Sequence, residues 1–352
     1  MTIESEIRGT VEVAPMASRT RVLAALRRRP VDSTPIVNPT SNVTLELMQL
    51  AGVAFPQAHR DPGAMAQLAA AGHTELGFDT AMPVFSIVQE ASALGCNIDW
   101  GRADEWPTVT EPIWTTADDI VIPGSFMAHP DIRCVLEAIR SLRHQFGDDV
   151  AIFGKAMGPW TLCYSTFGLE PFLIMTIDDP SGTDRCLARM KEVTLAFALA
   201  QIEAGADAVT IADHATGELV SANCYRRFLK DVHAELVRRL PSPLILHTCG
   251  RTLDRMPDIA DAGFEGFHFD SRNAPEQAMA TVAGRMALIG NVNNPATLMR
   301  GDPNAVYAEV ERALDAGVDL VGPECAVPLQ TPNENLRQIS RTVASLQHSA
   351  GR

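Results

Sequence analysis

The chain has 352 residues and a formal net charge of −14, because 29 Lys and Arg side chains stand against 43 Asp and Glu side chains. This acidic balance argues against a protein built to bind nucleic acid or an anionic membrane surface. Hydrophobic residues make up 46% and charged residues 20%, as in an ordinary soluble enzyme. The length suits one large α/β barrel or two medium domains.

The N-terminus and the cysteines indicate a cytoplasmic protein. No apolar run approaches the roughly 18 to 20 residues of a membrane span. The first residues lack the basic start and the apolar stretch of a secretory signal, so residues 1–16 are expected to form a flexible tail before a single domain over 17–352. The seven cysteines are odd in number and widely scattered, which argues for reduced thiols.

Strands and helices are expected to alternate along the chain, with a recurring signal at their joints. From the middle onward a helix ends in Gly, an acidic residue follows two positions later, and an apolar run begins, as around Gly205, Gly263 and Gly317. Such a glycine fits a left-handed helix end before a short loop. The expected strands are 35–40, 78–84, 150–158, 206–213, 243–250, 263–270, 286–293 and 319–325. The expected helices include 183–203, 222–239, 303–316 and 334–347.

Eight parallel strands with helical crossovers predict a TIM-type (β/α)8 barrel, in preference to an open doubly wound sheet. The stretch 85–149 holds only weak strand signals and several prolines. It is therefore expected to be an insertion of helices and loops between the second and third strands, near the mouth of the barrel.

Polar side chains gather at the predicted carboxyl ends of the strands, where TIM barrels carry their active sites. Core packing alone does not account for this concentration. The residues are Asp213, His214, His247, Cys249, Asp270, Asn291, Asn293 and Cys325.

Three of these residues predict a metal site. His247 and Cys249 are two positions apart at the end of one strand, so both side chains point to the same side. Cys325 ends the last strand in a similar Gly- and Pro-flanked segment. A histidine and a cysteine in this spacing also occur by chance in a protein core, but the third ligand favours Zn²⁺ with one position left open.

The open position of such a site suits an incoming thiol, because zinc lowers the pKa of a bound thiol and delivers it as thiolate. Asp270, at the end of the sixth strand, is the candidate for a weak fourth ligand. Glu324 is a poorer candidate, because its side chain is expected to point away from that of Cys325.

The chain resembles the uroporphyrinogen decarboxylase superfamily, and within it the zinc methyltransferases that move a methyl group from a methylated corrinoid protein to coenzyme M. The resemblance covers nearly the whole chain after about residue 17. It rests on RVLAALRRRPVDSTPIV, TLELMQLAGVAFPQAHRDP, GFDTAMPVFSIVQEASALGC, the turn GPWTL at 158–162, GNVNNPATLMRGDP, and HTCG followed by PECAVPLQTP.

This resemblance implies a distorted TIM barrel, with His247, Cys249 and Cys325 as zinc ligands, and methyl transfer that depends on a methylcobamide. The decarboxylase branch fits less well, since those enzymes open with an Arg-rich segment that binds carboxylates. The corresponding stretch here, NPTSNVTLELM, contains no arginine. No D-x-H-x-x-G corrinoid motif appears, so a separate corrinoid protein is expected as the partner that supplies the methylcorrinoid.

Three functions remain open at this point. The first is a zinc methyltransferase between a methylcorrinoid protein and a small thiol. The second is a donor-side enzyme that demethylates a small compound onto a corrinoid protein. The third is a non-catalytic paralogue that binds a corrinoid or a metal.

The other polar residues have two interpretations each. Asp213, His214 and Asp270 are the candidate catalytic residues; Asp213 and His214 either contact substrate or corrinoid at the mouth, or they cap a helix. Asn291 and Asn293 are the candidates for binding the corrinoid cofactor, and they either line the pocket or make turns. Lys155, at the end of the third strand, is a possible contact for the acidic group of a thiol substrate.

Overall fold

The computed structural model describes residues 14–350. The predicted flexible tail therefore lies almost entirely outside the described residues. At its end, the backbone N–H of Met16 donates a hydrogen bond to Asp32. Within the described part, none of the helices combines the length and the apolar character that crossing a membrane requires.

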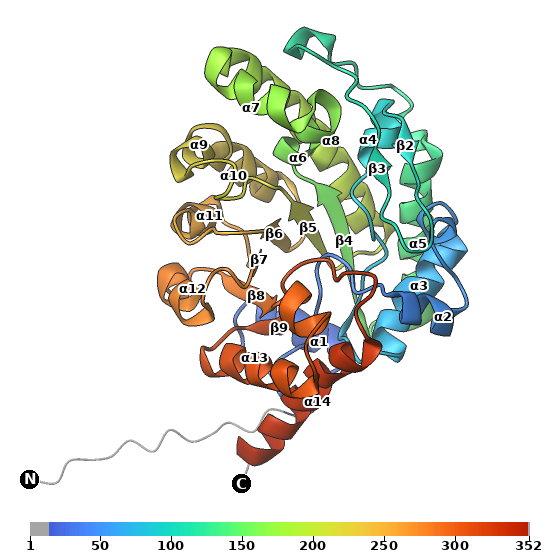
Figure 1. Cartoon of the computed structure of the whole chain (residues 1–352), viewed down its shortest axis with the longest axis vertical. Coiled ribbons are helices and arrows are strands. Elements are labelled where there is room, and N and C mark those ends of the chain that lie inside the picture. Colours follow the sequence, from blue (N-terminus) through green and yellow to red (C-terminus); the bar gives the residue numbers. More distant parts are fainter. Residues whose placement is uncertain (1–13, 351–352) are drawn as a thin grey trace, which may run out of the picture.

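Seven parallel strands form one sheet that curls around a buried centre, with helices on its outside (Figure 1). Neighbours in the sheet follow chain order, apart from the two strands of the insertion. The strands are β1 (Thr80–Ala81), β4 (Ala151–Met157), β5 (Ala208–Ala212), β6 (Leu244–Thr248), β7 (Gly266–Phe269), β8 (Ala287–Val292) and β9 (Leu320–Pro323). The barrel architecture predicted from the sequence is confirmed.

The first of the eight expected strands is not a strand in the structure. The segment 35–40 makes a single isolated bridge, between Ile36 and Val321 of β9. Its backbone still joins the two edges of the sheet, because Val37 donates to Val321 on one side and Asp79 donates to Ile36 on the other. Proline, which has no N–H to donate, occupies positions 35 and 39 and explains why the ladder stays short.

Helices cover the outer face of the sheet. Each crossover between parallel strands needs such a segment, and these helices supply it. Their bounds are α1 (Ser18–Leu26), α2 (Leu45–Ala51), α3 (Pro62–Thr74), α4 (Gln89–Leu94), α5 (Pro130–Phe146), α6 (Pro159–Phe167), α7 (Leu169–Asp178), α8 (Pro180–Ala204), α9 (Ala222–Phe228), α10 (Lys230–Arg239), α11 (Met256–Ala262), α12 (Pro275–Val282), α13 (Pro303–Asp315) and α14 (Asn333–Ala350).

Two helical predictions need correction. The expected helix 222–239 is two helices, α9 and α10, which meet at Leu229. The segment GPWTL was expected to be a turn, but only Gly158 lies outside a helix there, and Pro159 begins α6. Proline is favoured in the first turn of a helix, where its missing N–H costs nothing.

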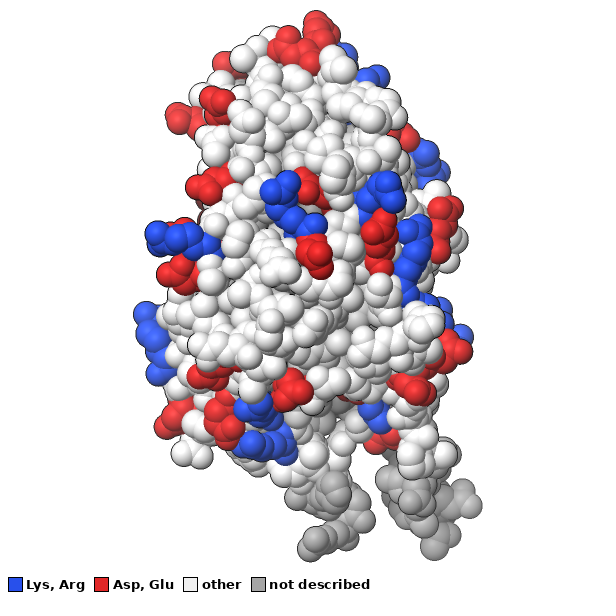
Figure 2. All heavy atoms as spheres, turned by 90° about the vertical axis from the view of Figure 1, so that its right-hand side faces the viewer, with Lys and Arg blue, Asp and Glu red and all other residues white. Residues whose placement is uncertain are grey.

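The insertion predicted for 85–149 is confirmed. It consists of α4, a two-stranded antiparallel ribbon of β2 (Ile98–Asp99) and β3 (Thr108–Val109), and the long helix α5. On the face shown in Figure 2, basic side chains lie beside acidic ones, and wide areas carry neither. This face therefore presents no continuous basic surface of the kind that binds nucleic acid.

Gly322 lets the segment around residue 37 lie against β9, because a Cβ there would meet the Val37 carbonyl oxygen at 1.8 Å. We expect Gly322→Ala to lower the free energy of unfolding by about 1–3 kcal/mol or more, the cost of overpacking. Urea unfolding followed by circular dichroism measures this. Gly124→Ala is the matched control, since a Cβ at Gly124 meets nothing within 4 Å. Equal stability of the two variants would show that the contact is unimportant.

Candidate functional site

His247, Cys249 and Cys325 meet at the carboxyl rim of the barrel. His247 lies in β6, Cys249 follows that strand, and Cys325 follows β9, 78 residues further along the chain than His247. The three ligand atoms form a nearly equilateral triangle. His247 Nε2 lies 3.2 Å from Cys249 Sγ and 3.3 Å from Cys325 Sγ, and the two sulfurs are 3.3 Å apart.

The His247 ring is oriented by the strand beside it. Its Nδ1 lies 3.2 Å from the carbonyl oxygen of His268 in β7, and a carbonyl only accepts, so Nδ1 carries the proton. In the neutral ring this leaves the Nε2 lone pair facing the two sulfurs. A hydrogen bond to the far nitrogen is the usual way in which proteins fix a metal-binding histidine.

The thiols of Cys249 and Cys325 shift each other's pKa in opposite directions. A hydrogen bond from Cys249 holds the pKa of Cys325 well below its usual value, and the nearby His247 ring lowers it further. The same hydrogen bond, together with burial, raises the pKa of Cys249 well above its usual value. A divalent metal beside the sulfurs would favour the loss of the second proton, and cysteine ligands bind such a metal as thiolates.

The donor set fits Zn²⁺. Ligand atoms on one tetrahedral Zn²⁺ lie about 3.5 Å apart, given Zn–S bonds of about 2.3 Å and Zn–N bonds of about 2.0 Å. The triangle needs only a few tenths of an ångström of expansion to reach that spacing. Three protein ligands of this type leave one position for a substrate, as in catalytic rather than structural zinc sites.

His214 is the fourth group at the site. Its ring nitrogen lies within 4.8 Å of the ligand atoms of His247 and Cys249. Burial, and then the neighbouring His247, lower the pKa of His214. The backbone N–H of His214 donates to the Thr161 hydroxyl, which fixes the loop after β5. The structure therefore brings His214 into the site, as its place at a strand end predicted.

The two acidic candidates for a fourth metal ligand, Asp270 and Glu324, accept hydrogen bonds from backbone N–H groups. Asp270 accepts hydrogen bonds from the N–H groups of Gly250 and Arg272, one on each carboxylate oxygen. Glu324 likewise accepts from the backbone N–H groups of Ser271 and Asn294, one on each carboxylate oxygen. Asp270 as a fourth metal ligand stays a prediction.

Asp213 is held by hydrogen bonds at the start of α6, and its role as a catalytic residue stays a prediction. Its carboxylate is fully buried and accepts from the N–H of Thr161 in the first turn of α6, as well as from the Thr161 hydroxyl. His233 of α10 also donates to it at 3.0 Å, and Tyr225 lies 3.0 Å from the other nitrogen of that ring. Gly158 permits this packing, because a Cβ there would meet Asp213 at 2.2 Å.

The side chains of Asn291 and Asn293 form hydrogen bonds to the backbone of the loops around them. Asn291 donates to the carbonyl of Asn273, and the Asn293 side chain accepts from Ala296 at the start of a short helical turn. Neither lines the pocket described next. Their proposed contact with a corrinoid stays a prediction.

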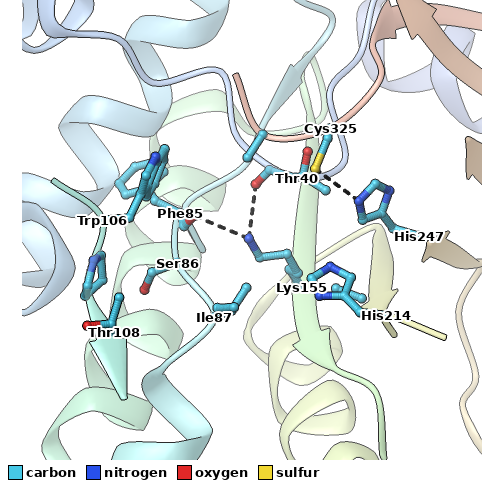
Figure 3. Close-up of a pocket in the computed structure, with 13 residues that line it drawn as sticks. Thr40, Phe85, Ser86, Ile87, Trp106, Thr108, Lys155, His214, His247 and Cys325 are labelled. Atoms are coloured by element: carbon cyan, nitrogen blue, oxygen red, sulfur yellow. Dashed lines mark hydrogen bonds between the residues drawn. The ribbon is translucent and has the colours of Figure 1, made fainter. Parts of the chain in front are cut away.

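A pocket of about 320 Å³ opens beside the triangle, and its walls are mostly apolar (Figure 3). One wall comes from the strand ends and the other from the insertion. The lining residues from the insertion were not predicted individually from the sequence, although the insertion itself was expected near the mouth. The lining residues are Thr40, Phe85, Ser86, Ile87, Trp106, Pro107, Thr108, Lys155, Ala212, His214, His247, Cys325 and Ala326.

Comparison with known proteins places these features in a family. The model of the family described as uroporphyrinogen decarboxylase (URO-D) matches residues 17–346. The methylcobamide:CoM methyltransferase MtaA of Methanosarcina barkeri is 33% identical, with 91% of this chain and 96% of that protein covered. A methylated-thiol–coenzyme M methyltransferase of Methanosarcina mazei is also 33% identical, over 94% of this chain and 89% of its own length.

A decarboxylase and a solved methyltransferase structure also match the chain. The uroporphyrinogen decarboxylase of Anaeromyxobacter dehalogenans is 26% identical, over 91% of this chain and 96% of its own length. Among solved structures, a methyltransferase from Methanosarcina mazei superposes with a TM-score of 0.91 at 31% identity, covering 94% of this chain and 99% of the other.

The triangle predicts metal binding that depends on all three ligands. We expect the wild type to retain about one Zn²⁺ per chain after dialysis, and His247→Ala, Cys249→Ala or Cys325→Ala to lose most of it. Elemental analysis of the purified proteins measures this. Cys224→Ala, which removes a half-buried thiol outside the triangle, is the control. Retention of zinc by the Cys325 variant would refute the site.

The buried position of Asp213 predicts a stability defect without loss of metal. Asp213→Ala leaves the Thr161 and His233 donors without their acceptor, so we expect the free energy of unfolding to fall by about 2 kcal/mol or more. Chemical unfolding measures this, with zinc content as the second readout. Full stability together with lost activity would instead indicate a catalytic role for Asp213.

Proposed function

The chain belongs to the uroporphyrinogen decarboxylase family, and we propose that within it the protein transfers a methyl group from a methylated corrinoid to the sulfur of coenzyme M. The relatives at 33% identity are methyltransferases that act on coenzyme M, and they match over nine-tenths of this chain. The observation that supports the proposal most is the His–Cys–Cys triangle at the edge of a mostly apolar pocket.

The site suits activation of a thiol. A Zn²⁺ ion held by His247, Cys249 and Cys325 would lower the pKa of an incoming thiol and keep it as a thiolate nucleophile at neutral pH. The protein's own residues orient the ligands and exclude water. His214 lies beside the triangle, where it either fills the fourth position in the absence of thiol or accepts the proton that the thiol loses.

We propose that the transfer runs from cobalt to sulfur. The new sulfur–methyl bond forms as the cobalt–carbon bond breaks, and the electron pair of that bond stays on cobalt, which leaves as Co(I). The apolar pocket walls favour this step, because a thiolate with little hydration is a stronger nucleophile. The alternative is the opposite direction, in which a small donor methylates Co(I). The assay described below distinguishes the two directions.

A decarboxylase acting on a porphyrinogen fits this pocket poorly. Among the described lining residues, Lys155 is the single Lys or Arg side chain, whereas a substrate with several carboxylates needs several cations. The pocket of about 320 Å³ also suits a small molecule. The lower identity to a decarboxylase, 26%, agrees with this preference.

We further propose a separate corrinoid protein as partner and a reducing compartment, the cytoplasm, as the setting. No D-x-H-x-x-G motif appears in the printed sequence, so the corrinoid is expected to arrive on another protein. All seven cysteines are free, which suits a compartment that keeps thiols reduced.

An assay with free methylcobalamin and coenzyme M tests the proposed function. We expect conversion of methylcobalamin to Co(I), followed by absorbance, that depends on zinc and falls by about a thousandfold in Cys325→Ala, as for the loss of a catalytic metal ligand. Cys224→Ala is expected to stay active. Methylation of Co(I) by small methyl donors, with coenzyme M inert, would instead identify the donor-side enzyme. Inactivity in both directions, with zinc bound, would contradict both the proposed function and the donor-side alternative.

A further inference from the structure

Lys155 is a buried cation without an anionic partner. It lies in β4 with 2% of its surface exposed, and its Nζ donates to two backbone carbonyls, those of Thr40 at 3.3 Å and Phe85 at 3.4 Å (Figure 3). Within the described residues no carboxylate lies within 4.0 Å of this ammonium group. Burial lowers the pKa of Lys155 to about 8, against the opposing fields of Cys325 and Glu90.

Glu90, the buried acid whose field reaches Lys155, does not pair with it. One of its carboxylate oxygens accepts the N–H of Met157 at 2.7 Å, and the other is buried with no partner. Burial raises the pKa of Glu90 to about 7. The positive charge of Lys155 therefore lacks a compensating anion at contact distance, although an uncompensated buried charge is costly.

The position of Lys155 is fixed by its backbone. Gln201 of α8 accepts from the Lys155 N–H and donates to its carbonyl, both at 2.9 Å. Gly154 allows this clamp, because a Cβ there would meet the Gln201 side-chain oxygen at 2.6 Å. The lysine is therefore held on an inward-facing position of the strand, with its ammonium group in the pocket.

Two corners of the ligand triangle line the same pocket. Lys155, His247 and Cys325 all line it, and the view in Figure 3 places Lys155 between the two ligands on one side and Trp106 and Thr108 on the other. An organic thiol bound with its sulfur at the triangle has its remaining atoms in the space that Lys155 faces.

We propose that Lys155 binds the acidic group of the thiol substrate and so selects short thiols that carry one negative charge. This inference rests on the proposed function and adds the residue that decides which thiol is used. A sulfonate and a carboxylate share the chemistry that an ammonium group recognises, and a single cation matches a single charge. Ser86 and Thr108 line the same pocket, whose volume of about 320 Å³ suits a short thiol.

The competing role for Lys155 is electrostatic support of the Cys325 thiolate. The two roles differ in their dependence on the substrate's charge. An anion anchor affects charged thiols alone, whereas support of the metal ligands affects every thiol equally. The discriminating measurement is therefore KM for charged and uncharged thiols in the same variant.

The experiment compares wild type, Lys155→Met and Lys155→Arg with free methylcobalamin and three thiols: 2-mercaptoethanesulfonate, 3-mercaptopropionate and uncharged 2-mercaptoethanol. In Lys155→Met we expect KM for the two anionic thiols to rise by about tenfold to a hundredfold, as for loss of a hydrogen bond to a charged group. KM for 2-mercaptoethanol is expected to change by less than about threefold, and Lys155→Arg to recover part of the preference. The KM values for 2-mercaptoethanesulfonate and 3-mercaptopropionate show whether the pocket binds a sulfonate or a carboxylate more tightly.

Lys191→Met is the matched control, because Lys191 pairs with Glu235 outside the pocket. Equal rises in KM for charged and uncharged thiols, or no rise for either, would overturn the proposal.

A binding measurement separates this inference from the proposed function. Calorimetric titration with ethanesulfonate, which has no thiol, is expected to show binding to the wild type that is lost in Lys155→Met with zinc content unchanged. Binding without methyl transfer would refute the proposed function and leave the anion site standing. If Lys155→Met does not fold, competition of ethanesulfonate against 2-mercaptoethanesulfonate in the wild type decides, and absence of competition overturns the proposal.

Discussion

Two hydrogen bonds made by His268 hold the ligand set together. Its backbone carbonyl accepts from His247 of β6, and its ring Nε2 donates to the carbonyl of Pro323 at the end of β9, at 2.8 Å. The ring is buried, and burial lowers its pKa to about 3, so it stays neutral and keeps this donor pattern. One residue in β7 thus links His247, in the strand that precedes Cys249, to the strand end that precedes Cys325. The convergence of ligands 78 residues apart depends on this link and on the parallel register of the strands between them.

The electrostatics of the rim follow from its low polarity. The thiol of Cys325, the imidazole of His247 and the buried ammonium group of Lys155 line one mostly apolar pocket, where charges interact more strongly than in water. Two thiolates would balance a divalent cation. A thiolate substrate with an acidic group would add two negative charges, one on its sulfur and one on its acidic group, and the ammonium group of Lys155 would offset one of them. A substrate with several acidic groups would leave still more charge uncompensated.

The sequence predicted the barrel and the ligand triangle because both follow from local patterns. His247, Cys249 and Cys325 end apolar strands, and parallel strands bring their carboxyl ends to one rim. The role of Asp213 was not decided, because a residue at a strand end faces the pocket or a helix depending on packing that the sequence does not reveal. The helix that Asp213 caps begins in a segment that was predicted as a turn. The sequence therefore did not indicate that a helix N-terminus lies beside Asp213. The pocket wall from the insertion was likewise missed, because Trp106 and Thr108 lie in a loop and a two-residue strand without periodicity.

Family membership alone does not determine the substrate of this chain. Methyltransferases and decarboxylases both match it across most of its length, so the barrel and its crossovers are shared by enzymes with different chemistry. The chemistry of a site is decided by the side chains that the strand ends and loops present to the pocket. A thiol-activating metal site needs two soft anionic ligands and one cation for the substrate's charge, whereas a multi-carboxylate substrate needs several cations and no thiolates. The rim of this protein, with two cysteines, one histidine and one lysine, meets the first requirement and not the second.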